Sequence, residues 1–178
     1  MLFPGGRLPL RIFENRYMDM AKACLKDGSP FGVCLILAGA EVGAPAVPAS
    51  IGCLAKIAEW DMPQLGVLQV SARGEQRFRI LTRSVQPDGL ARGRVEILPV
   101  EADAAPPPEH SRCVKLLERV IEQHPGLLEP PHRLDSCAWV SARLAELLPL
   151  PLETKQALLE LDDARTRLER VNALVRPG

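Results

Sequence analysis

Two pairs of residues have types that could bind a metal ion or catalyse a reaction. His110 and Cys113 are three positions apart, a spacing that suits two ligands of one zinc ion, but no second pair completes four ligands. Ser71 and Lys115 could act as a nucleophile and its base, yet their spacing places neither a base nor an oxyanion pocket beside the serine. We therefore predict no catalytic residue and no metal site.

Nucleotide hydrolysis and redox chemistry lack their usual residues as well. The sequence contains no GxxxxGK[ST] loop to hold the phosphates of ATP, so we expect no nucleotide cofactor and no ATPase activity. The histidines, His110, His124 and His132, lie in or beside proline-rich turns and are interpreted as surface residues. The five cysteines include no CxxC pair, so we expect small buried apolar side chains rather than disulfides.

Arginines cluster in the central part of the sequence. They fall on neighbouring predicted strands: Arg73, Arg77, Arg79, Arg83, Arg92 and Arg94. A basic strand face could bind RNA through Arg77, Arg79 and Arg83, but a solvated face explains the pattern too. The 22 basic and 22 acidic residues balance, and aromatic residues, which stack on single-stranded bases, make up only 4% of the chain. Nucleic acid is therefore the alternative partner.

A second candidate binding site is the segment from Trp60 to Leu65. It carries Trp60, Met62 and Leu65 in what we predict to be a connection between strands, where polar residues are usual. These side chains either fold back as a lid over the core or form an exposed apolar patch for varied polypeptides. The lid is the preferred interpretation.

Hydrophobic periodicity predicts strands in the first part of the chain and helices in the second. An amphipathic helix is expected from Glu14 to Lys26, with Gly28 as its stop signal. A strand from Phe31 to Ala38 and an irregular segment from Gly43 to Pro48 are expected to follow. Four further strands are expected, separated by Pro63, by Arg73-Gly74 and by Pro87-Asp88-Gly89: Ile51 to Trp60, Leu65 to Ala72, Gln76 to Val85 and Leu90 to Val100. The prolines from Pro106 to Pro108 indicate a linker, so we predict a β-rich domain at 1–105 and a helical bundle at 106–178. Helical periodicity is found from Val114 to Ile121, from Cys137 to Leu147 and from Glu153 onward, where Asp162-Asp163 can cap a new helix.

Several motifs occur in the order that a known family shows. Leu2 to Tyr17 reads LFPGGRLPLRIFENRY, which resembles the LFPG and LPLxIFExRY signature that opens the Lon protease substrate-binding domain. Shorter matches follow in order: Phe31 to Val33, Glu41 to Gly43, Ile51 to Cys53, Ala72 to Ile80 and Leu150 to Gln156. Within the first motif, Glu14 and Arg16 are predicted to hold the helix start in place, Arg16 by pairing with a carboxylate or a strand carbonyl.

The resemblance implies an α+β fold, a PUA-like pseudo-barrel of mainly antiparallel strands followed by a C-terminal helical bundle. Family members usually have a further strand of the form LPLFPL before LFPG; either an upstream start supplies it here, or the barrel closes differently and leaves a strand edge unpaired. In full-length Lon this region is joined to an ATPase and a protease and is credited with holding substrate polypeptides. The resemblance therefore implies a non-enzymatic adaptor that binds client polypeptides, with a separate protease or ATPase as a further candidate partner.

The expected compartment is the cytoplasm. No stretch approaches the ~18 consecutive apolar residues of a membrane-spanning helix, and the first residues lack the build of a signal peptide. We therefore expect no membrane association. A small molecule in the mouth of the barrel is a further possibility that sequence leaves open.

Overall fold

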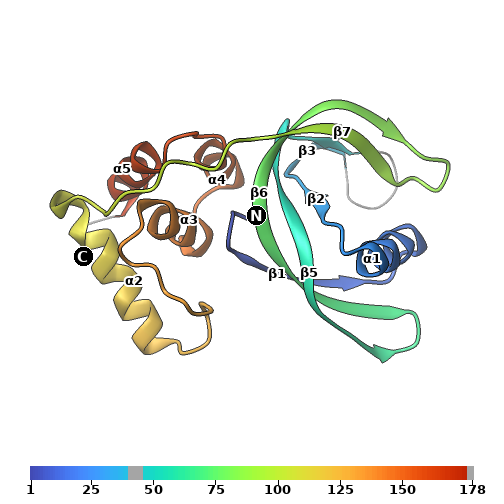
Figure 1. Ribbon diagram of the computed structural model, residues 1–178, viewed down its shortest axis with the longest axis horizontal. Helices are drawn as coiled ribbons and strands as arrows, with labels where there is room; N and C mark the ends of the chain where they lie inside the picture. Colours follow the sequence, from blue (N-terminus) through green and yellow to red (C-terminus); the bar gives the residue numbers. More distant parts are fainter. Residues whose placement is uncertain (40–45, 176–178) are drawn as a thin grey trace. The chain divides into compact units, whose positions relative to one another are not determined.

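The first half of the chain contains the strands and one helix, and the second half contains the other helices, which confirms the predicted order (Figure 1). The computed structural model describes residues 1–39 and 46–175. The chain divides into two compact units, Met1–Pro99 and Val100–Gly178. Whether these parts fold separately, as the predicted domains at 1–105 and 106–178 imply, stays a prediction.

The first unit is built on an antiparallel sheet. Its strands are β1 (Arg7–Ile12), β2 (Phe31–Val33), β5 (Ile51–Gln64), β6 (Val67–Val85) and β7 (Ala91–Ile97). They pair in the order β1-β6-β5-β2, and β7 pairs with the second half of β6. Every pairing in the described part of the chain is antiparallel, as the short turns predict.

The predicted strand from Phe31 to Ala38 is interrupted in the structure. It forms β2 and a separate strand β3 (Ile36–Ala38), which pairs with β4 (Val47–Pro48). The irregular segment predicted from Gly43 to Pro48 therefore ends in a strand, and its residues up to Pro45 lie outside the described part. The matched motif from Glu41 to Gly43 lies outside it too.

Helix α1 (Asn15–Asp27) packs on one face of the sheet and closes its core. Met18 and Ala21 of the helix meet Leu68 and Val70 of β6 in one buried cluster. The helix ends at Gly28, whose φ of 66° is the left-handed conformation that glycine adopts without strain. The predicted helix and its stop signal are both confirmed.

The predicted turn at Arg73-Gly74 is wrong, because β6 continues through these residues as one strand of 19 residues. The backbone N–H of Gly74 donates to the oxygen of Gly6, and its own oxygen accepts from Gly5. A Cβ at Gly74 would lie 2.2 Å from the carbonyl oxygen of Phe3. The glycine therefore allows the N-terminal segment to cross the strand closely, which is a known role of glycine within strands.

Each predicted helical segment in the second unit is present, and the last of them forms two helices. The elements are a 3-10 turn η1 (Pro108–His110), α2 (Ser111–Gln123), α3 (Cys137–Leu147), α4 (Leu152–Leu159) and α5 (Ala164–Leu174). Asp163 caps α5, as predicted, by accepting from the backbone N–H of Thr166 at 2.7 Å. Ser136 caps α3 in the same way through the N–H of Trp139 at 2.9 Å.

The segment after β7 belongs to the helical unit. Glu101 forms an ion pair with both terminal nitrogens of Arg167, a side chain only 2% exposed. Asp103 accepts hydrogen bonds from the Ser136 hydroxyl at 2.6 Å and from Arg133 at 2.9 Å. These contacts hold residues 101 to 103 against the helices.

Candidate functional site

The hairpin formed by β5 and β6 carries the predicted polypeptide-binding residues. Trp60 and Met62 lie within β5, and Leu65 lies in the turn that links the strands. The predicted connection from Trp60 to Leu65 is therefore wrong, since only residues 65 and 66 form the turn. Pro63 does not end the strand because it falls where the pairing register shifts, between Asp61 and Gln64, and such a bulge tolerates proline.

All three candidate side chains are exposed. Trp60 is 59% exposed, Met62 40% and Leu65 94%. A lid would bury these side chains against the core, so the preferred interpretation of the sequence is wrong and the exposed patch is what the structure contains. The exposed Phe13 follows Ile12, which pairs with Leu68 near the same end of the sheet.

The two faces of β5 differ in chemistry at the base of this hairpin. Residues opposite one another in antiparallel strands point to the same side of the sheet. Trp60 lies opposite Val70, on the face that α1 covers further along. Glu59 and Asp61 lie on the other face. One strand therefore presents an aromatic ring on one face and two carboxylates on the other.

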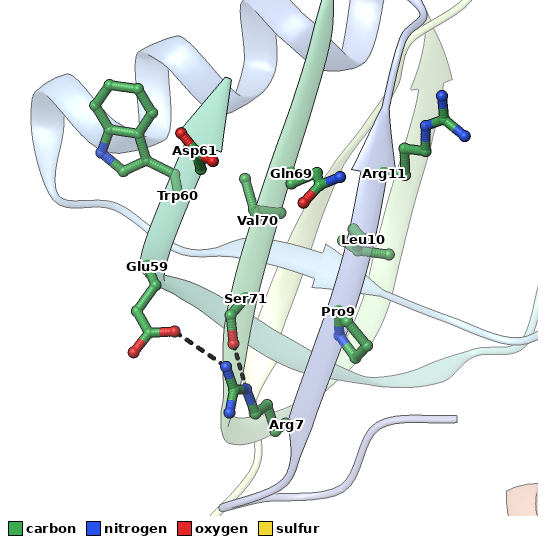
Figure 2. Close-up of a pocket in the computed structure, with 10 residues that line it drawn as sticks. All are labelled: Arg7, Pro9, Leu10, Arg11, Glu59, Trp60, Asp61, Gln69, Val70 and Ser71. Carbon is green, nitrogen blue, oxygen red and sulfur yellow. Dashed lines mark hydrogen bonds and ion pairs between the residues drawn. The ribbon is translucent and has the colours of Figure 1, made fainter. Parts of the chain in front are cut away.

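A pocket of about 460 Å³ opens beside these residues (Figure 2). It is lined by β1, β6 and β5, and β5 contributes Glu59, Trp60 and Asp61. Arg7 of β1 donates to the Ser71 hydroxyl at 2.6 Å and to Glu59 at 3.0 Å, across β6. Asp61 accepts from the backbone N–H of its neighbour Met62 at 2.8 Å.

A second pocket, of about 580 Å³, lies between the start of α1 and the turn that joins β6 to β7. Arg16 spans these elements, pairing with Glu14 at 2.9 Å and donating to the carbonyl oxygen of Gly89 at 2.9 Å. The carboxylate partner predicted for Arg16 is confirmed, and the carbonyl that it also contacts belongs to a turn rather than to a strand. The motif residues thus join the helix start to the turn.

The three arginines proposed for RNA binding do not form one exposed face. Arg77 is buried, at 4% exposure, so its predicted place on the solvated face is wrong. The pairing of β6 with β5 shifts by one residue between Gly74 and Arg77, which places Arg77 on the same face as the buried Ala72. Arg79 pairs with Glu96 at 3.2 Å, and Arg83 donates to the oxygen of Ala46 at 2.5 Å. RNA binding through these residues stays a prediction.

The histidine and the cysteines considered for chemistry are mostly buried. His110 is buried in η1, so the interpretation of it as a surface residue is wrong: its turn packs against α2 and α5. Across residues 1–39 and 46–175, no group of three His, Cys, Asp or Glu side chains is placed to hold a metal ion. Four of the five cysteines are buried and Cys34 is partly buried, as predicted.

No helix in the described ranges is long and apolar enough to cross a membrane.

Together, the antiparallel sheet and the helices that follow it define an α+β protein. A profile of the ATP-dependent protease La (LON) substrate-binding domain matches residues 1–176, and the chain belongs to this family. The predicted resemblance is therefore confirmed over nearly the whole chain.

Two solved structures support this assignment. The crystal structure of a Lon N-terminal domain protein from Xanthomonas campestris is 39% identical, with a TM-score of 0.82 over 99% of this chain and 94% of that one. The N-terminal domain of Lon protease from the Mycobacterium avium complex has a TM-score of 0.65 over 96% of this chain and 90% of that one. At 22% identity, the second similarity concerns the fold alone.

Longer relatives contain this region as one part. Lon protease of Paraburkholderia phytofirmans is 31% identical over 96% of this chain. Protein cereblon of Gallus gallus is 32% identical over 56% of this chain. The chain spans 22% of the length of each of these relatives.

Proposed function

We propose that this chain is a polypeptide-binding module that uses the β5–β6 hairpin as its binding surface. The observation that carries the proposal is the exposure of Trp60, Met62 and Leu65 at one end of the sheet. The family to which the chain belongs is described as a substrate-binding domain of a protease, which supports polypeptides as the ligand class.

The chemistry of the three side chains suits varied polypeptide partners. A tryptophan offers a large apolar contact area, and a methionine adapts its shape because its side chain is unbranched and flexible. Leu65, the most exposed of them, contributes little to the core because burial is what stabilises an apolar side chain. Removing these side chains should therefore cost binding rather than folding.

The module acts without catalysis in this proposal. We expect purified protein to hydrolyse neither ATP nor peptides, so a bound client in the cytoplasm would be delivered to a separate protease or ATPase. Turnover that co-purifies with the chain and disappears in a point variant would contradict the non-catalytic role.

The test is the double variant Trp60→Ala with Met62→Ser. Binding of a reduced and alkylated, permanently unfolded protein is measured together with the melting temperature. We expect affinity to fall at least about fivefold, as for interface residues that contribute more than about 1 kcal/mol, with little change in melting temperature. The matched control is Leu81→Ala with Val85→Ser, which removes exposed apolar side chains from the end of β6 that pairs with β7 rather than with β5.

The control variant is expected to bind like the wild type. Unchanged binding in the Trp60 and Met62 variant would contradict the proposed site. A large fall in its melting temperature would instead assign these residues to stability.

A further inference from the structure

Beyond Ala55, the outer edge of β5 is open. β2 pairs with this edge only from Cys53 to Ala55, and in the described part of the chain no strand pairs with it from Lys56 to Gln64. An unpaired strand edge presents backbone N–H and C=O groups that an extended polypeptide can pair with. This edge carries the exposed Trp60 and Met62.

The pairing of β5 with β6 is regular at three consecutive residues of this open stretch. In this stretch β5 residues Glu59, Trp60 and Asp61 lie opposite Ser71, Val70 and Gln69 of β6. The register shifts immediately before and immediately after these three residues. Bulges of this kind limit how far a further strand can pair. A bound segment would therefore pair with β5 mainly along Glu59, Trp60 and Asp61.

The side chains of these three residues define what a bound segment must carry. A strand beside β5 would place alternate side chains next to Trp60 on one face and next to Glu59 and Asp61 on the other. Arg7 partly compensates the charge of Glu59. Asp61 is exposed, and its carboxylate accepts from the neutral N–H of Met62.

The pocket beside these carboxylates has room for a long side chain. Its volume is about 460 Å³, and besides Glu59 and Asp61 its lining includes the polar side chains of Gln69 and Ser71. A lysine or arginine side chain that reaches over β5 would enter the pocket that Asp61 and Gln69 line, whereas the Glu59 carboxylate is turned toward Arg7 (Figure 2).

We propose that the hairpin selects extended segments in which apolar residues alternate with lysine or arginine. The apolar side chains contact Trp60, the basic ones contact Glu59 and Asp61, and the backbone pairs with the edge of β5. This inference rests on the proposed polypeptide-binding function and adds the class of segment that the site prefers.

The experiment compares short labelled peptides by fluorescence anisotropy on the whole chain. In the first peptide lysine and valine alternate, and in two matched peptides glutamine or glutamate replaces each lysine. We expect the lysine peptide to bind about threefold to tenfold more tightly than the glutamine peptide, and the glutamate peptide to bind most weakly. The preference should shrink at high salt because the carboxylates are exposed.

The matched variant is Glu59→Gln with Asp61→Asn. It removes both charges but keeps an oxygen that can accept from Arg7 and from the N–H of Met62. We expect it to bind the lysine and glutamine peptides with nearly equal affinity. A lysine peptide with N-methylated valines, which cannot complete the backbone pairing, should lose most of its binding to the wild type.

Two results separate the inference from the proposed function. Equal binding of all three peptides, weakened by Trp60→Ala with Met62→Ser, would overturn the preference for basic residues and leave the hairpin as the binding site. No binding of any peptide, or binding that this Trp60 and Met62 variant leaves unchanged, would overturn both.

Discussion

Asp103 shows how one side chain organises the segment that enters the helical unit. Partial burial raises the pKa of this carboxyl, but hydrogen bonds from Ser136 and from the N–H groups of Ala138 and Ala104, together with the charge of Arg133, lower it below its ordinary value. The ionised form is therefore favoured in the folded state. Asp103 stabilises the fold above its unfolded pKa, and this contribution is lost as the pH falls through the lower folded value.

We predict that Asp103→Asn lowers the stability of the protein at neutral pH. The difference from the wild type should shrink below about pH 4, because the carboxyl of the unfolded chain takes up a proton there before that of the folded protein. Urea unfolding of both proteins at pH 7 and at pH 3 measures this. Asp135→Asn serves as the control, because it removes the charge of a carboxylate nearby in the same unit. An equal difference at both pH values would rule out an ionised Asp103 as the stabilising group.

Cys34 gives a second prediction at this scale. Burial raises the pKa of its thiol to about 11. Since the thiolate is the reactive form, only about a thousandth of this thiol is ionised at pH 8. We expect alkylation of Cys34 by iodoacetamide to be much slower in the native protein than in urea, as followed by mass spectrometry of its peptide. Equal rates in both solutions would show that the thiol is not shielded.

At the scale of elements, the sequence predicts helices better than strand limits. The stop at Gly28 and the cap at Asp163 are local signals, and both occur in the structure as predicted. The predicted strand breaks at Gly74 and Pro63 are wrong. Gly74 is needed where the N-terminal segment crosses β6, and Pro63 lies at a shift in the pairing register; neither feature is visible in the local sequence. The burial of Arg77 follows from a register shift that sequence alternation cannot show.

We predict that Gly74→Ala destabilises the first unit by about 1–3 kcal/mol, since its Cβ would lie 2.2 Å from a backbone oxygen that hydrogen-bonded neighbours hold in place. The control is Gly66→Asn in the turn between β5 and β6. Its φ of 81° is a conformation that asparagine tolerates, and a Cβ there would meet no atom within 4 Å other than those of its chain neighbours. Melting temperature and urea midpoint measure both variants. A cost at position 74 no larger than at position 66 would contradict the close crossing.

At the scale of the whole molecule, the chain is two units joined near residue 99, and the joining segment is tied to the second. The pair of Glu101 and Arg167 is buried, and removing one partner would leave the other charge buried without compensation. The predicted boundary places Glu101 in the sheet domain, 1–105, because in the sequence only the prolines from Pro106 to Pro108 mark the linker. A contact between residues 66 positions apart leaves no local signal.

We predict that Glu101→Ala destabilises the helical unit by about 3–5 kcal/mol while the sheet stays folded. Hydrogen exchange resolved by peptide should show faster exchange in α3 and α5 and little change in β5 and β6. Uniformly faster exchange across both units would show that they unfold together, and no change in the helices would contradict the role of the pair.

The binding role of the hairpin is tested most directly by residue-resolved NMR. The backbone amides of the ¹⁵N-labelled chain are followed while a permanently unfolded polypeptide is added. We expect the largest shift changes from residue 56 to residue 67 and in the side-chain N–H of Trp60, with smaller changes at the neighbouring rungs of β1 and β6. Changes concentrated in α2 to α5, or along β7 at Arg92 and Arg94, with the hairpin unaffected, would contradict the account.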